Sequence, residues 1–142
     1  MTTVSENNAV KSWTQVTHVS ILVKALGALS LGGVAWVHIL DLGGKLSETP
    51  YLGYAYIVLV IGALVAAVML LANRRNGWAL GGALAVGAIL AYVLSRTTGL
   101  PYATDDIGNW LEPLGVWALS LEGVVVLLSA YVFARRNRKA DL

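Results

Sequence analysis

Residues 52–72, LGYAYIVLVIGALVAAVMLLA, carry no charged side chain and decide the class of this protein. A helix of about 20 apolar residues crosses the roughly 30 Å of hydrocarbon in a bilayer, because each residue adds about 1.5 Å. Lipid offers no hydrogen-bond partner to a backbone N–H or C=O group, so a segment that crosses it must be helical. We therefore predict a membrane-spanning helix here.

Three further apolar segments of similar length lie at roughly 16–42, 77–95 and 114–134. The composition agrees, with 57% hydrophobic residues, 13% charged residues and a mean hydropathy of +0.69 over 142 residues. Short connections make consecutive helices antiparallel neighbours. The sequence thus predicts an all-α membrane protein, an up-down-up-down bundle of four transmembrane helices that forms a single domain over residues 1–142.

The basic residues favour one orientation of this bundle, because cytoplasmic loops carry an excess of Lys and Arg. The N-terminal segment 1–15 and the basic tail 135–142 are therefore predicted to be cytoplasmic, in a bacterial cytoplasmic (inner) membrane. The tail would attract anionic membrane lipids, and nucleic acid is not an expected partner. The bases on the predicted cytoplasmic side are Lys11, Lys24, Arg74, Arg75, Arg135, Arg136, Arg138 and Lys139, against Lys45 and Arg96 on the other side.

A long outer loop, residues 96–113, joins the third and fourth predicted helices. Thr104 could cap a short helix, with Asp105 and Asp106 well placed against its N-terminal dipole. Apolar residues then recur at i, i+3, i+4 and i+7, beginning at Ile107. This spacing predicts a short helix near 104–112 that lies along the interface and covers the outer end of the bundle.

Glu122 stands in the apolar stretch WALSLEGVVVLLSAY, residues 117–131. An ionised carboxylate at that depth costs several kcal/mol, so we expect it to be paired or protonated. Side chains lean towards the N-terminus of their helix, which lets His38 and Arg96 approach it from other helices. The predicted polar cluster in the outer half of the bundle consists of His38, Asp41, Tyr92, Arg96, Glu112 and Glu122.

Three interpretations of this cluster remain open at the level of sequence. In the first, Glu122 pairs with Arg96 or His38 and so fixes which helices are neighbours. In the second, the same residues form a proton or ion pathway, which needs a His and a buried acid at unequal depths. Metal or haem ligation is the third, but His38, Asp41, Glu112 and Glu122 have no diagnostic zinc spacing, and we predict no metal site and no cofactor.

Small residues form two rows along the third predicted helix, where another helix could approach closely. One row may serve packing within the bundle and the other an association with a second copy of the chain. The rows are Gly77, Gly81 and Ala85, and Ala83, Gly87 and Ala91.

Residues 95–123, SRTTGLPYATDDIGNWLEPLGVWALSLEG, resemble a pattern in small uncharacterised bacterial membrane proteins with four predicted helices. The pattern combines SRTxGLP, an acidic and aromatic turn, EPLG and a Glu in the last helix. The resemblance implies that Arg96, Pro101, Glu112 and Glu122 belong together, and it implies no activity.

No activated Ser, phosphate-binding loop or ligand motif is evident, and the absence of cysteine excludes thiol chemistry. We therefore predict an accessory or interaction protein of the membrane and not an enzyme. The first alternative is a small oligomeric transporter linked to protons or ions. The second is a redox subunit that binds haem or quinone. Expected partners are membrane lipids, a further copy of the chain, or another membrane protein.

Overall fold

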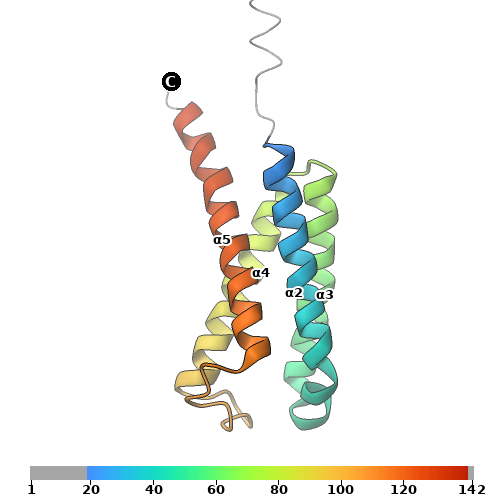
Figure 1. The fold of residues 1–142 in the computed structure, drawn as a ribbon, viewed down its shortest axis with the longest axis vertical. Coiled ribbons are helices and arrows are strands. Elements are labelled where there is room, and N and C mark those ends of the chain that lie inside the picture. Colours follow the sequence, from blue (N-terminus) through green and yellow to red (C-terminus); the bar gives the residue numbers. More distant parts are fainter. Residues whose placement is uncertain (1–18, 141–142) are drawn as a thin grey trace, which may run out of the picture.

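A computed structural model describes residues 19–140, which form four long helices. These are α2 (Ile21–Glu48), α3 (Pro50–Leu71), α4 (Asn76–Thr97) and α5 (Pro113–Ala140). Each is long and apolar enough to cross a membrane. Successive helices run antiparallel, so the predicted up-down-up-down fold is confirmed (Figure 1).

Each helix packs against two neighbours, since α2 contacts α3 and α5, and α4 also contacts α3 and α5. The start of α2 and the end of α5 lie at the same end of the bundle, which we call the terminal end (Figure 1). Residues 98–112 connect α4 to α5 at the opposite end, which we call the loop end. Towards the loop end, α4 diverges from α3 (Figure 1).

The outward faces of the helices are apolar. Large side chains such as Trp36, Val58 and Leu127 are more than half exposed. Exposed apolar area on this scale would promote aggregation in water, whereas it matches the hydrocarbon of a bilayer. Together with helix length, this makes the chain a multi-pass membrane protein.

The first helix differs from its predicted range of 16–42, of which residues 16–18 lie outside the described part. It begins at Ile21, after Ser20 accepts a hydrogen bond from the Leu22 amide at 3.3 Å. It also continues six residues past Leu42, through two glycines that do not break it. Only Thr49 then separates α2 from α3.

The core of the terminal half is built on small residues. A Cβ added at Gly27 would lie 2.7 Å from the ring of the buried Trp78, so this ring takes the space of a side chain at Gly27. Gly77 allows α4 to approach α3, because a Cβ there would lie 3.1 Å from the Ala66 carbonyl oxygen. These contacts bring the helices close together in this half of the membrane.

The short helix predicted near 104–112 is not formed, and this is a correction to the prediction. Residues 104–112 make a series of turns, with Gly108 at φ 80°. The Gly108 amide donates to the Arg96 carbonyl at 2.9 Å. Asp106 turns inward to meet Arg96 instead of lying at a helix N-terminus. The buried charge on α4 therefore overrides the local helical pattern of this segment.

Candidate functional site

A cavity of about 530 Å³ lies in the loop-end half of the bundle. It exists because α4 diverges from α3 towards the loop end (Figure 1). Its walls come from all four helices and are mainly apolar. Exposed small residues of α3 and α4 line it, including Ala55, Ala83 and Gly87, so it opens on the side of the bundle that faces lipid.

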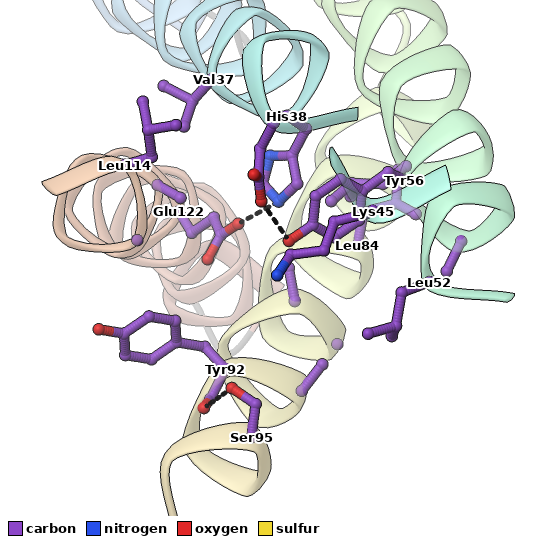
Figure 2. Close-up of a pocket in the computed structure, with 18 of the residues that line it drawn as sticks. Val37, His38, Lys45, Leu52, Tyr56, Leu84, Tyr92, Ser95, Leu114 and Glu122 are labelled. Atoms are coloured by element: carbon purple, nitrogen blue, oxygen red, sulfur yellow. Dashed lines mark hydrogen bonds and ion pairs between the residues drawn. The ribbon is translucent and has the colours of Figure 1, made fainter. Parts of the chain in front are cut away.

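Glu122 of α5 forms part of the cavity wall although only 2% of it is exposed. Its Oε1 lies 3.8 Å from Nε2 of His38 on α2, and the two side chains point towards each other (Figure 2). That distance is too long for a hydrogen bond, and no hydrogen bond formed within residues 19–140 ends on this carboxyl group. Glu122 is thus buried, faces the cavity and has room to interact with something else.

The orientation of His38 determines which nitrogen meets Glu122. Its Nδ1 lies 2.9 Å from the backbone oxygen of Val34, one turn earlier in α2. A carbonyl oxygen only accepts, so Nδ1 carries a hydrogen and donates it. The His38 ring also packs edge-on against Tyr56 of α3, with 4.7 Å between ring centroids. Nε2 is therefore the nitrogen that faces the carboxyl group.

The His38–Glu122 pair shares one proton under this arrangement. A lone carboxylate would be costly at this depth, so Glu122 is either protonated beside a neutral His38 or ionised beside a protonated one. Both states have a net charge of zero and differ only in where the proton sits. The pair can release that proton if another positive charge takes its place.

A second group of charges closes the loop end of the cavity. Arg96, which is 6% exposed, places Nη1 2.9 Å from Asp106 Oδ1 and Nη2 3.6 Å from Glu112 Oε2. Its guanidinium lies 4.7 Å from the centroid of the Tyr92 ring. Lys45 of α2 reaches the other Asp106 oxygen at 3.5 Å. Asp106 therefore links α2 to α4.

Glu112 has a structural role at the start of α5 in addition to its ion pair. Its carboxylate accepts hydrogen bonds from the Leu114 amide at 3.0 Å and from the Gly115 amide at 2.6 Å. A negative charge is favourable at a helix N-terminus. Gly115 makes room for this cap, since its Cβ would lie 2.5 Å from the Tyr92 ring and 2.8 Å from Glu112 Oε2.

All six residues of the predicted polar cluster line the cavity, but they form two groups and leave Asp41 apart from both. Glu122 lies with His38, while Arg96 lies with Glu112 and Tyr92. The alternative pairing of Glu122 with Arg96 is not formed. Asp41 occupies a third place, where it accepts a hydrogen bond from the Tyr56 hydroxyl at 3.3 Å. The cluster is His38, Asp41, Tyr92, Arg96, Glu112 and Glu122.

Four further polar residues of the cavity lie outside the predicted cluster: Lys45, Tyr56, Ser95 and Asp106. Lys45 could have been found, because it lies seven residues after His38 and so shares a helix face with it. The prediction ended the helix at Leu42 and so placed Lys45 in a loop. Tyr56 and Asp106 carry no such signal, since their positions depend on how α3 and the loop pack.

The two rows of small residues on α4 have different surroundings. Gly77, Gly81 and Ala85 are buried against α2 and α3. The second row, at Ala83, Gly87 and Ala91, is exposed and lines the cavity opening.

The chemistry open to this site is binding and proton exchange. Among residues 19–140, no group of three His, Asp or Glu side chains is arranged to hold a metal ion. No protein-family model, curated protein or solved structure matches this chain in the comparisons. The resemblance of residues 95–123 to small bacterial membrane proteins therefore stays a prediction, and function must be argued from the cavity.

Proposed function

We propose that this chain is a non-enzymatic accessory protein of the membrane that binds a small amphipathic molecule in its loop-end cavity. One observation carries the proposal: an apolar cavity of about 530 Å³ with a buried carboxyl group in its wall. Sites for small molecules usually have volumes of roughly 300–1,000 Å³, apolar walls and a few convergent polar groups. The cavity has all three properties.

The opening between α3 and α4 supports entry from the lipid. An amphipathic molecule would place its apolar part against Leu59, Leu84 and Ala88 and its polar part near Glu122. Burial of its apolar surface favours binding at roughly 25 cal/mol per Å² relative to water, and less when the molecule already resides in lipid. The polar groups would then decide which molecules remain bound.

The proposal is tested by what co-purifies with the full chain from native membranes in mild detergent. Wild-type protein should carry one small amphipathic molecule in near-stoichiometric amount, measured by mass spectrometry. Gly87→Leu should reduce it several-fold, because a Cβ at Gly87 has open space and a longer side chain extends into the opening. Gly32→Leu is the matched control, since that position also has open space but does not line the cavity.

The proposal fails if wild type carries no bound molecule. It also fails if Gly87→Leu, like the control Gly32→Leu, carries as much of the bound molecule as wild type does.

A proton- or ion-linked transporter is the second candidate function. The observation that favours it is the approach of His38 Nε2 to within 3.8 Å of the Glu122 carboxyl group at the cavity wall. Transport also requires access from the terminal end, where the packing around Trp78 and Gly27 closes the interior of the bundle. Proton or cation flux in proteoliposomes that falls with Glu122→Gln would favour transport over binding alone.

A redox role with haem or quinone ranks third. Nδ1 of His38 is engaged by Val34, which leaves Nε2 beside Glu122 as the nitrogen available to iron or to a quinone oxygen. A Soret absorption band, or a quinone identified by mass spectrometry, in the same purified preparation would favour this role.

The membrane and the orientation belong to this proposal too. We place the chain in the bacterial cytoplasmic membrane with both termini cytoplasmic, because Arg74, Arg75 and Arg135 lie at the terminal end. The loop-end bases Lys45 and Arg96 are paired with acids. The chain has no cysteine, so single cysteines report topology cleanly.

A membrane-impermeant maleimide applied to the outside of cells, with the outer membrane permeabilised, should label Asn109→Cys. It should leave Asn73→Cys unlabelled until the cytoplasmic membrane is opened. The reverse pattern would invert the orientation.

Self-association remains a prediction as well. The exposed row of Ala83, Gly87 and Ala91 offers a face for a second copy, and a copy seated there would cover the cavity opening. The oligomeric state in mild detergent checks it, since Ala83→Leu should convert a dimer to a monomer.

A further inference from the structure

We propose that the ligand of the cavity is a lipophilic cation, and that it binds in exchange for the single proton held by His38 and Glu122. This inference rests on the proposed function and specifies the chemical class of the molecule. It is carried by three properties of the cavity: its charge balance, the fixed partners of its bases, and the free side of the Glu122 carboxyl group.

The charge balance of the lining favours a cation. When the two bases and the three acids outside the His38–Glu122 pair are counted as ionised and the pair as neutral, the lining has a net charge of −1. In a low-dielectric interior, an excess negative charge attracts a cation and repels an anion far more strongly than it would in water. The charged lining groups outside the pair are the bases Lys45 and Arg96 and the acids Asp41, Asp106 and Glu112.

Each base of the cavity already contacts an acid, which disfavours an anionic ligand such as a fatty acid. Arg96 contacts Asp106 and Glu112, and Lys45 contacts Asp106. An anion near these bases would be repelled by the same carboxylates, and Arg96 Nε, the donor without a partner among the described residues, is buried. By contrast, among residues 19–140 the Glu122 carboxyl group has one ion-pair partner, His38 Nε2 at 3.8 Å.

The aromatic and apolar lining suits a cation whose charge is surrounded by carbon. Tyr56 stands beside His38 and Glu122 (Figure 2), where its ring can contact a cationic centre. Leu59, Leu84 and Ala88 provide apolar contacts for the rest of the molecule. A strongly hydrated ion such as Na⁺ prefers a shell of oxygen ligands and would gain nothing from these apolar contacts.

The exchange conserves charge. When a cation binds beside Glu122, one proton leaves, either from the Glu122 carboxyl group or from Nε2 of His38. Either route leaves an ionised Glu122 beside a neutral His38 and the bound cation, and one proton passes to water. The site therefore keeps its net charge of −1 on binding.

The test uses purified full-length chain in a non-ionic detergent and three probes of similar shape. These are tetraphenylphosphonium, a permanent cation, tetraphenylborate, an anion, and triphenylphosphine oxide, which is neutral. Titration calorimetry in two buffers of different ionisation enthalpy gives both the affinity and the number of protons released, with empty micelles as the blank.

The cation should bind at least about tenfold more tightly than either other probe, because it alone gains the attraction of the ionised Glu122. It should release about one proton per molecule bound.

Glu122→Gln should abolish proton release and lower the affinity for the cation by at least about tenfold, while the affinity for the neutral probe stays unchanged. Glu48→Gln is the matched control, because Glu48 is exposed at the end of α2 and does not line the cavity. Gly87→Leu keeps every charge and should weaken the cation and the neutral probe together. If Glu122→Gln does not fold, Gly87→Leu still tests whether the probes bind in the cavity.

The outcomes separate this inference from the proposed function. Equal binding of the three probes, or cation binding without proton release, would overturn the cation exchange while leaving a ligand-binding cavity. Failure of all three probes, with a neutral or anionic molecule co-purifying from native membranes, would do the same. If no probe binds and nothing co-purifies, both proposals fall.

Discussion

The two halves of this bundle differ in how closely their helices approach. In the terminal half, glycines on α2 and α4 let Trp78, Leu70 and Ala66 pack without space for even one added methyl group. In the loop-end half, the same helices separate around a cavity of about 530 Å³ with charged groups in its wall. Within one membrane domain, close packing and a binding site therefore occupy different depths.

This difference has an energetic meaning. Association of helices in lipid depends on van der Waals contacts between close backbones, so the terminal half contributes most of the packing energy. In the loop-end half, α2 and α3 stay close at Gly53, whereas α4 and the start of α5 are held by ion pairs around Arg96 and by the cap at Glu112. Substitutions in the two halves should thus affect different properties, namely folding in one and binding in the other.

The largest effect is expected from Gly77→Leu in the terminal half. A Cβ at Gly77 would lie 2.9 Å from the Met69 Cβ and 3.1 Å from the Ala66 carbonyl oxygen, so α3 and α4 would have to separate. Overpacking of this kind costs about 1–3 kcal/mol or more, and we expect about 3 kcal/mol with poor recovery of folded protein. Unfolding by denaturing detergent and size-exclusion profiles measure it.

The matched control is Gly87→Leu on the same helix, where a Cβ meets nothing within 4 Å. Its free energy of unfolding should change by less than about 1 kcal/mol. Equal losses in the two variants would remove the distinction between a close-packed half and an open half.

Arg96→Gln should have the next largest effect, confined to the loop end. It removes the positive charge that faces Asp106 and Glu112. Breaking a fully buried ion pair costs about 3–5 kcal/mol. Because both acids are partly exposed here, we expect about 2 kcal/mol, with faster amide hydrogen exchange over residues 98–112.

Arg135→Gln is the control for Arg96→Gln, since Arg135 is exposed and, among the described residues, hydrogen-bonds to Tyr131 of its own helix. It should leave exchange at the loop unchanged. If amide exchange over residues 98–112 is unchanged in Arg96→Gln, the turns of the loop are stable without the ion pairs of Arg96.

The sequence was sufficient to predict the spans of this fold because the bilayer imposes length and hydropathy on each helix. Its failures lie where tertiary contacts outweigh local pattern. The first helix was predicted to end at Leu42, yet α2 continues through Gly43 and Gly44 and places Lys45 in the cavity. Asp106 was predicted to lie in the first turn of a short helix, yet it forms an ion pair with Arg96 and no helix forms.

Six residues of the candidate site were predictable, but the pairing among them was not. An acid in an apolar helix must find partners, and few residues at the right depth were available, so the cluster followed from His38, Arg96 and Glu122. Which pairs form depends on the rotation of each helix about its axis, and that rotation depends on tertiary packing. The cavity itself has no sequence signal, because it results from the divergence of α3 and α4.

Glu122→Gln should change stability by less than about 1 kcal/mol, despite the burial of this residue. Glutamine has nearly the same shape, and replacing a buried charged pair by neutral groups is often neutral or stabilising. Thermal unfolding of the variant and of Glu48→Gln should therefore match wild type. A loss of about 3 kcal/mol or more would instead give Glu122 the role of holding α5 against α2, and the cavity would lose its clearest functional group.

The smallest effect is expected where α3 holds the loop. The Tyr51 hydroxyl donates to the Pro101 carbonyl at 2.6 Å, next to the turn in which Leu100 and Ala103 exchange backbone hydrogen bonds. Because Tyr51 is partly exposed, Tyr51→Phe should cost only about 0.5–1 kcal/mol, seen as a few-fold faster amide exchange at Leu100 and Ala103. Tyr54→Phe, one turn further along α3, removes a hydroxyl that makes no hydrogen bond within residues 19–140 and should change nothing. If both variants exchange at the wild-type rate, Tyr51 does not hold the loop, and its protection depends on the ion pairs of Asp106 with Arg96 and Lys45.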